Sequence, residues 1–200
     1  MAGFWNNFVM TFIPLFIVID AFGNLPFVIT MCQPVGRRAG CRLVHYAIIT
    51  ATVVGLVFLF FGQFILNAMN ISVGAFAIAG GVILLVLSIK YMTTGHMVAV
   101  IQEELMAIVP IGTPLTVGPA TIATLILLAA QYPLYTVLIA FAVNMLIAWV
   151  IFLSSRRLSR FLGEGGIKAV SQVFNLLLAA IGVSMVLQGL DLTGIIEITE

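Results

Sequence analysis

The sequence predicts an all-α polytopic membrane protein, on three observations. Hydrophobic residues make up 62% of the chain, charged residues only 8%, and the mean hydropathy is +1.25. The apolar residues form runs as long as the roughly 20 residues that cross a bilayer as a helix. The basic residues are confined to alternate connections between these runs. This composition excludes a soluble domain, and the lack of a basic patch or tail excludes nucleic acid as a partner.

Six segments are long and apolar enough to cross the membrane, and we expect them at approximately 4–32, 43–66, 72–92, 105–131, 133–153 and 170–190. The connections are short, the longest running from about 154 to 169. Residues 131–133 leave only a tight turn between the fourth and fifth spans. Residues 1–200 are therefore expected to form a single transmembrane domain. Its first span should remain in the mature protein, because the start lacks the basic leader and cleavage site of a secretory signal.

The eight Lys and Arg residues all fall on one side of the six-span topology, at Arg37, Arg38, Arg42, Lys90, Arg156, Arg157, Arg160 and Lys168. Basic connections stay in the cytoplasm, so we expect both termini outside, in a multi-pass protein of the cell (inner) membrane. Cys32 and Cys41 flank the first basic connection, on the reducing side. Free thiols are expected there, and not a disulfide.

Spans 1–3 and 4–6 resemble two versions of one unit, about residues 1–95 and 103–200. Each unit begins with a span interrupted by Pro and Gly and closes with a span ending in glycine, "LSIKYMTTG" and "IGVSMVLQG". Because each unit has an odd number of spans, the second must enter the membrane from the opposite side. The prediction is two inverted three-helix repeats with broken helices in spans 1 and 4, an arrangement typical of transporters that bind substrate near the midplane.

Asp20 is the only charged residue between Phe4 and Met31. A carboxylate near the bilayer centre costs about 2.5–3.5 kcal/mol on the insertion scale, so a functional role is the first hypothesis. Gly23, Asn24 and Pro26 follow it and would interrupt the helix. The alternative is a structural acid bonded to a polar side chain of a neighbouring span. The sequence leaves open whether Asp20 is ionised.

The fourth span contains "VPIGTPLTVGPATIAT", in which three prolines and two glycines fall within ten residues. Thr113 and Thr121 add hydroxyls that can bind a ligand or satisfy the broken backbone. The N-terminus of a half-helix attracts an anion, and the carbonyls that end the preceding half attract a cation. Two opposed breaks would therefore suit a zwitterion. The alternative is that these residues merely kink a membrane helix.

Other polar and small residues have simpler interpretations. Asn144, Gln172 and Asn175 could complete a polar interior, but interhelical hydrogen bonding is the preferred interpretation. Gly80 and Gly81 form a small-residue surface that suits internal packing or self-association. No Ser/His/Asp set, zinc-binding helix or phosphate loop is present, so we expect neither an enzyme nor a bound cofactor.

Three segments resemble motifs of the MarC family of six-span membrane proteins, namely "IDAFGNLP", "ISVGAFAIAGGVILL" and "VPIGTPLTVGPATI". The resemblance covers nearly the whole chain in order and spacing, with Ala21 and Ala120 departing from the family pattern. It implies two inverted three-span repeats, and some archaeal relatives are regarded as transporters of small neutral amino acids. The site residues that it implies are Asp20, Gly23, Asn24, Pro26, Pro114, Gly118 and Pro119.

Together, these observations predict a secondary transporter of a small neutral amino acid such as glycine or alanine. It would work by alternating access, with the substrate between the breaks in spans 1 and 4. No nucleotide-binding motif is present, so the energy would come from a coupling ion, H+ or Na+, or from the substrate gradient. The alternatives are a membrane protein with an assembly or regulatory role, and an ion channel or exporter of another small solute. The exact substrate, the direction of transport and the oligomeric state, a homo-oligomer included, stay open.

Overall fold

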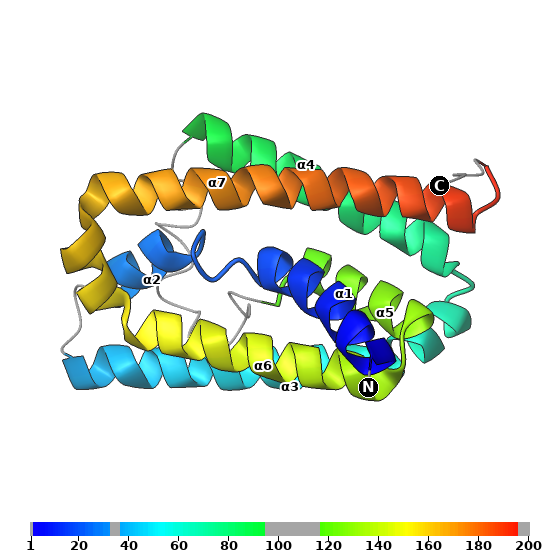
Figure 1. Ribbon diagram of the computed structural model, residues 1–200, viewed down its shortest axis with the longest axis horizontal. Coiled ribbons are helices and arrows are strands. Elements are labelled where there is room, and N and C mark those ends of the chain that lie inside the picture. The colour runs from blue at the N-terminus through cyan, green and yellow to red at the C-terminus, as the bar shows by residue number, and fades with distance from the viewer. Residues whose placement is uncertain (1, 33–36, 95–116, 196–200) are drawn as a thin grey trace.

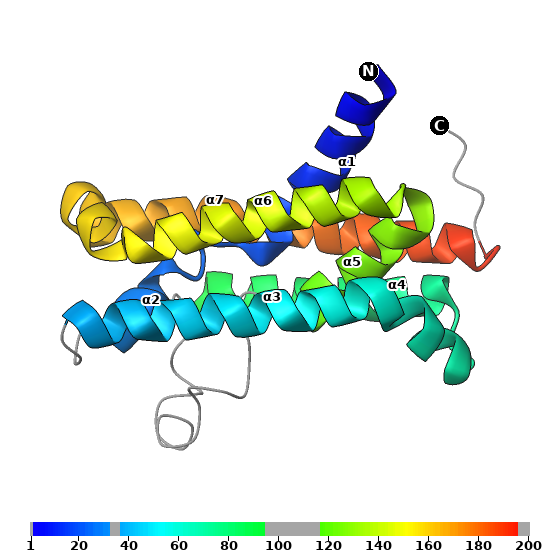
Figure 2. The same cartoon turned by 90° about the horizontal axis from the view of Figure 1, so that it is seen from below.

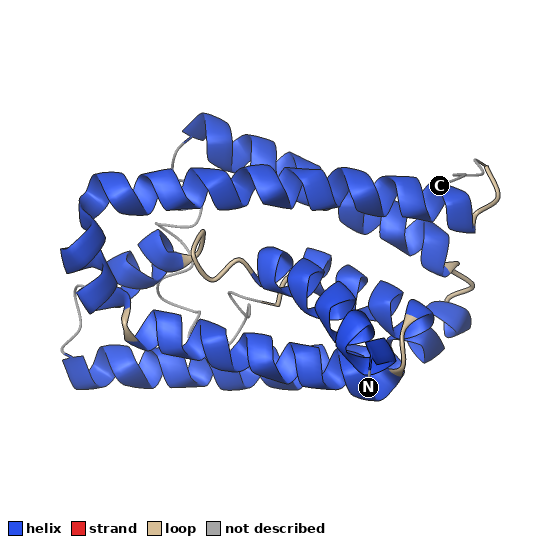
Figure 3. Cartoon of the chain, in the orientation of Figure 1, coloured by secondary structure: helices blue, strands red, loops and turns tan. Residues whose placement is uncertain are grey.

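A computed structural model describes residues 2–32, 37–94 and 117–195 of the chain. Within these ranges the secondary structure is helical, without strands, and short turns join the helices (Figure 3). The prediction of an all-α fold is confirmed. The described helices are α1 (Ala2–Ile19), α2 (Leu25–Cys32), α3 (Arg37–Ala68), α4 (Val73–Thr94), α5 (Pro119–Gln131), α6 (Leu134–Leu153) and α7 (Ser155–Leu192).

Four of these helices, α3, α4, α6 and α7, are long and apolar enough to cross a membrane. They correspond to the expected second, third, fifth and sixth spans. The first and fourth expected spans do not form single long helices in the described residues. The first is divided into α1 and α2, and the described part of the fourth is the 13-residue α5. Large apolar side chains such as Phe61 and Phe64 are exposed along the long helices, as lipid-facing surface requires.

The divided and short helices lie between two pairs of long ones. In Figure 1, α4 and α7 run side by side along one edge and α3 and α6 along the other, with α1, α2 and α5 between the pairs. Figure 2 shows the same arrangement from below, with the N-terminal part of α1 projecting beyond α6. The interruption between α1 and α2 is therefore held inside the bundle.

Small residues bring α4 and α7 into backbone contact. A Cβ added to Gly81 would lie 2.5 Å from the carbonyl oxygen of Gly182, and one on Gly74 would lie 2.8 Å from that of Gly189. Gly80 faces the other way, where an added Cβ would lie 2.5 Å from Cβ of Ala123 in α5. The internal-packing interpretation of the Gly80–Gly81 pair is confirmed.

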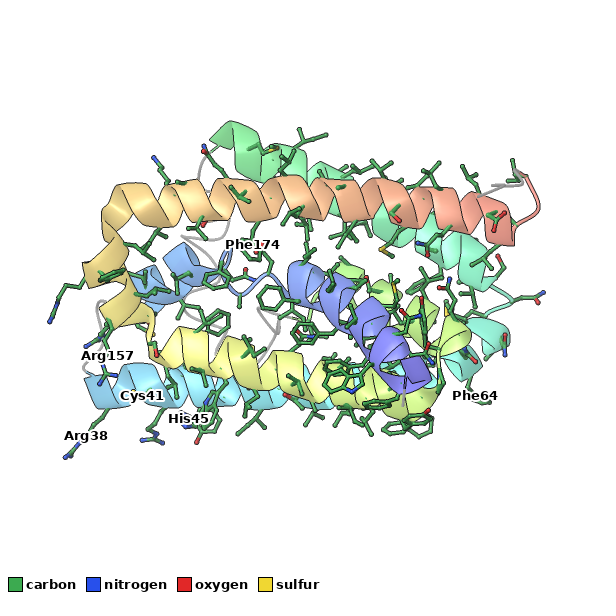
Figure 4. The ribbon with its side chains drawn as sticks, in the orientation of Figure 1. Arg38, Cys41, His45, Phe64, Arg157 and Phe174 are labelled. Atoms are coloured by element: carbon green, nitrogen blue, oxygen red, sulfur yellow. The ribbon has the colours of Figure 1, made fainter. Side chains whose placement is uncertain are left out.

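Two of the arginines lie at the opposite end of the molecule from the start of α1 and the end of α7. Figure 4 shows Arg38 and Arg157 at the left, and in Figure 1 α1 begins and α7 ends towards the right. Cys32 and Cys41 are free thiols, as expected.

Two basic connections are more helical than expected. The segment from about 154 to 169 was expected to be a loop, but α7 begins at Ser155, and Gly163, with φ of 66°, is the residue inside it with non-helical backbone angles. The loop prediction is wrong because the first part of this segment contains three Arg and two Leu, which favour helix, and the glycines that follow interrupt helical geometry only at Gly163. Similarly, α3 begins at Arg37, several residues before the expected start at 43. The tight turn between α5 and α6 is confirmed at Tyr132 and Pro133.

Candidate functional site

The chain leaves helical geometry at Asp20, whose φ is 48°. This left-handed conformation is uncommon outside glycine, and Asp and Asn are among the residues that tolerate it best. The Asn24 N–H still donates to the Asp20 carbonyl at 3.0 Å, and the Leu25 N–H donates to the Phe22 carbonyl at 3.2 Å. The chain therefore makes a compact turn before α2 begins. The predicted interruption of the helix next to Asp20 is confirmed.

The Asp20 side chain folds back over this turn. It is 3% exposed, and its Oδ1 accepts a hydrogen bond from the Gly23 N–H at 2.9 Å. Its Oδ2 is buried and has no hydrogen-bond partner among the described residues. An unsatisfied buried acceptor costs about 1–3 kcal/mol, and more when it is charged. This oxygen is thus placed to accept a hydrogen bond from a donor that the described residues do not supply.

Asn24 connects the two sides of the turn. Its side-chain Nδ2 donates to the Ile19 carbonyl, the last of α1, at 3.1 Å. Its Oδ1 is buried and, like Asp20 Oδ2, has no partner in the described parts of the chain. The turn therefore presents two unsatisfied oxygen acceptors from residues four positions apart. Donors such as an ammonium group or a hydrated cation suit acceptors of this kind.

Helix α7 supports the turn from the other side. Ser171 Oγ donates to the Phe22 carbonyl at 3.3 Å, and the Phe174 ring lies 5.0 Å from that of Phe22 and 5.9 Å from that of Phe16, between ring centroids. Figure 4 shows Phe174 extending from α7 towards this turn. Sequence reasoning missed Ser171 and Phe174. Their spacing of three places them on one helix face, but nothing in it indicates contact with the first span.

Helix α5 begins close to the predicted break in the fourth span. Gly118 precedes the helix in an extended conformation, and no side chain caps the first N–H groups. Pro119 occupies the first helical position, where a missing N–H is tolerated. Thr121 is buried in the first turn. A Cβ added to Gly118 would meet no described atom within 4 Å.

The two segments meet inside the bundle. Helices α1 and α5 are in contact, and Val18 and Ala120 belong to one buried apolar cluster with residues of α4 and α7. Asp20 follows Val18 by two residues and Gly118 precedes Ala120 by two, so the turn and the start of α5 both adjoin this cluster along the chain. Pro26 lies in the first turn of α2. Thr113 and Pro114 lie outside the described residues.

Asn144 acts mainly as a link between helices. Its Nδ2 donates to the Phe12 carbonyl of α1 at 3.2 Å and to the Ala140 carbonyl of its own helix at 2.9 Å. The preferred interpretation as interhelical hydrogen bonding is confirmed for this residue. In the part of the chain that the structure describes, no group of three His, Cys, Asp or Glu residues could hold a metal ion.

Comparison with known proteins gives matches over nearly the whole chain. Residues 5–193 match the family described as "MarC family integral membrane protein". The UPF0056 inner membrane protein YhgN of Escherichia coli (strain K12) is 33% identical over 195 residues, covering 92% of this chain and 96% of that protein. The UPF0056 membrane protein MJ1677 of Methanocaldococcus jannaschii is 27% identical over 195 residues, covering 92% of this chain and 95% of that protein. No solved structure matches the chain. With four helices long and apolar enough to span a bilayer among its described residues, and a family match from residue 5 to residue 193, this chain belongs to the MarC family of integral membrane proteins.

Proposed function

We propose that this protein is a secondary transporter of small neutral amino acids such as glycine or alanine. The observation that carries the proposal is the pair of buried, unsatisfied acceptors, Asp20 Oδ2 and Asn24 Oδ1, at an interrupted membrane helix. An ionisable residue inside the membrane is usually functional. The ammonium group of an amino acid supplies several donors and a positive charge, which matches this pair of acceptors.

The start of α5 supplies the complementary chemistry. Its first-turn N–H groups have no side-chain cap, and a helix N-terminus favours an anion such as a carboxylate. No described atom lies within 4 Å of a Cβ added to Gly118, so the described residues leave its backbone accessible to a ligand. In this proposal the substrate lies between the turn at Asp20 and the start of α5, with Thr121 at the edge of the site. The bundle is small, so the space inside it suits a substrate with a small side chain.

The packing of the helices supports two inverted repeats. α3 packs against α5 as α6 packs against α1, and α4 packs against α5 as α7 packs against α1 and α2. The Gly74–Gly189 and Gly81–Gly182 contacts have the same spacing on both helices. Exchanging the first and second halves of the chain maps these particular contacts onto one another, which is the pattern expected of inverted repeats in a transporter. Alternating access would then come from rocking one repeat against the other.

The orientation follows from the charges. With the basic end in the cytoplasm, both termini lie outside and the protein is a multi-pass component of the inner membrane. The Escherichia coli relative is named an inner membrane protein, which supports this location. Transport would draw on a gradient of H+, Na+ or the substrate itself, with no enzymatic step and no bound cofactor.

Uptake of radiolabelled glycine and alanine into proteoliposomes tests the proposal. We expect uptake of each amino acid to be saturable and to be inhibited by the other amino acid. If H+ or Na+ is the coupling ion, an imposed gradient of that ion should accelerate uptake. Protein-free liposomes control for leakage. Folded protein that takes up neither amino acid under any of these gradients would refute the proposal and favour an assembly or regulatory role. Non-saturable ion flux would indicate a channel instead.

A further inference from the structure

A half-open cavity of about 560 Å³ lies at the basic end of the molecule. Four helices contribute to its wall. Cys32 ends α2, Val44 lies in α3, Phe152 lies near the end of α6, and Arg156 lies in the first turn of α7. None of the residues proposed to bind the transported substrate lines this cavity, so the proposed transport does not account for it.

Three arginines, Arg156, Arg157 and Arg160, line this cavity. None of the described residues that line it is a carboxylate. One terminal guanidinium nitrogen of Arg156 donates to the Cys32 carbonyl at 2.8 Å, which holds this guanidinium at the cavity wall. The planar guanidinium presents several N–H donors in a fork that matches phosphate oxygens. The concentration of positive charge therefore favours a phosphate-bearing ligand.

Ser154 and Ser155 also line the cavity, and the rest of the wall is mostly apolar. Val44 and Phe152 come from the cores of α3 and α6 and are 3% and 1% exposed. Contact with these apolar side chains does not stabilise a small soluble anion, because such an anion is bound best by polar groups on all sides. A phospholipid matches both parts, since its phosphate can meet the arginines while its glycerol and first acyl carbons contact apolar side chains.

The first part of α7 is suited to lie at the membrane surface. Phe161 is 89% exposed although it is a large aromatic residue, and it directly follows Arg160. At Gly163, with φ of 66°, helical geometry is interrupted, and α7 changes direction there (Figure 1). Short amphipathic segments that combine arginines with exposed Phe or Leu lie in the interface between headgroups and acyl chains. The cavity therefore opens where lipid headgroups are found.

We propose that this cavity binds the headgroup phosphate of an anionic phospholipid. Basic pockets between membrane helices on the cytoplasmic side are a recognised means of holding such headgroups. Arg157 and Arg160 would contact the phosphate, while Arg156 keeps α2 attached to α7 beside it. The bound lipid would connect α2, α3 and α7. This assignment does not depend on the transport activity.

Native mass spectrometry of the detergent-solubilised protein, titrated with phosphatidylglycerol, tests the proposal. Phosphatidylcholine serves as the comparison with no net headgroup charge. We expect phosphatidylglycerol to bind more tightly, and the double variant Arg157→Gln/Arg160→Gln to bind it about 25-fold more weakly, at about fivefold for each arginine. Both arginines are exposed, so the fold should survive their replacement.

The matched control is Arg42→Gln/Lys168→Gln, which removes the same charge from residues that do not line the cavity. It should keep the affinity for phosphatidylglycerol within about twofold, because neither side chain lines the cavity that would hold the phosphate. Equal losses in the two double variants would overturn the proposal, since general charge attraction would then explain the binding. Binding of soluble glycerol 3-phosphate as tightly as the lipid would also overturn it, in favour of a water-soluble phosphate ligand.

Discussion

The carboxylate of Asp20 lies directly over the backbone of Gly23, whose N–H donates to Asp20 Oδ1 at 2.9 Å. A Cβ added to Gly23 would collide with this carboxylate, lying 2.5 Å from its Cγ. The glycine is therefore required by the position of the acid and not by its own backbone angles. The two residues form one unit, in which Gly23 makes the space that Asp20 fills.

Gly23→Ala should consequently destabilise the protein. The added methyl must displace the carboxylate or move the turn, and overpacking of this kind costs about 1–3 kcal/mol. The measurement is the thermal unfolding of the purified variant in detergent. Gly118→Ala is the matched control, because no described atom lies within 4 Å of its added Cβ. Equal stability of the two variants would show that the Asp20 carboxylate does not occupy this position.

Asp20→Asn should impair transport while the protein still folds. The amide can keep the hydrogen bond to the Gly23 N–H, but it removes the charge and one acceptor from the site. A hydrogen bond to a charged group contributes about 1.5–3 kcal/mol, so amino-acid uptake should fall at least about tenfold. Thermal stability should be unchanged or higher, because a buried charge no longer has to be inserted.

Uptake across a range of pH, normalised to folded protein, measures the effect of Asp20→Asn. Asp191→Asn makes the same chemical change at an exposed position near the C-terminus and should transport normally. Wild-type uptake by Asp20→Asn with an unchanged pH profile would contradict a functional role. Loss of folding with normal uptake per folded molecule would identify Asp20 as a structural acid.

Gly118→Leu should block substrate binding without unfolding the protein. Gly118 has extended backbone angles that any residue can adopt, and no described atom lies within 4 Å of an added Cβ, so leucine should be accepted by the fold. In the proposed site the same side chain would fill the volume that the substrate needs. Gly165→Leu, at another open position, is the control. If Gly118→Leu transports like the control, the substrate does not bind at the start of α5.

Local sequence signals were sufficient to predict the interruption at Asp20 and the start of α5 near Pro119, because Gly, Asn and Pro act on their own backbone. They were insufficient for the left-handed conformation of Asp20 and for its contact with Gly23, which depend on how the turn closes. The support from Ser171 and Phe174 could not be predicted, because it comes from a helix about 150 residues away. The helical start of α7 was missed because its charges were taken as a sign of a loop, although Arg and Leu favour helix.

Gly81→Leu should separate α4 from α7. A Cβ at this position would lie 2.5 Å from the Gly182 carbonyl oxygen and 2.9 Å from the Val186 backbone nitrogen, and backbone atoms cannot rotate away. We expect a loss of at least about 1–3 kcal/mol, measured as the midpoint of unfolding in a mixed-detergent titration. Val82→Leu changes the next residue, which is 47% exposed, and should shift stability by less than about 0.5 kcal/mol. Equal midpoints would show that α4 and α7 are not in backbone contact.

Cys41 should react with a membrane-impermeant maleimide only after spheroplasts are permeabilised. It is partly exposed and lines the cavity at the basic end, and basic connections remain in the cytoplasm. Ile195→Cys, introduced with both native cysteines replaced by serine, provides the opposite case, because residue 195 is 69% exposed and lies at the end of the chain that should face outward. Its thiol should react in intact spheroplasts. Labelling of Cys41 before permeabilisation, together with protection of Ile195→Cys, would invert the proposed topology and place the arginine-lined cavity on the outer face.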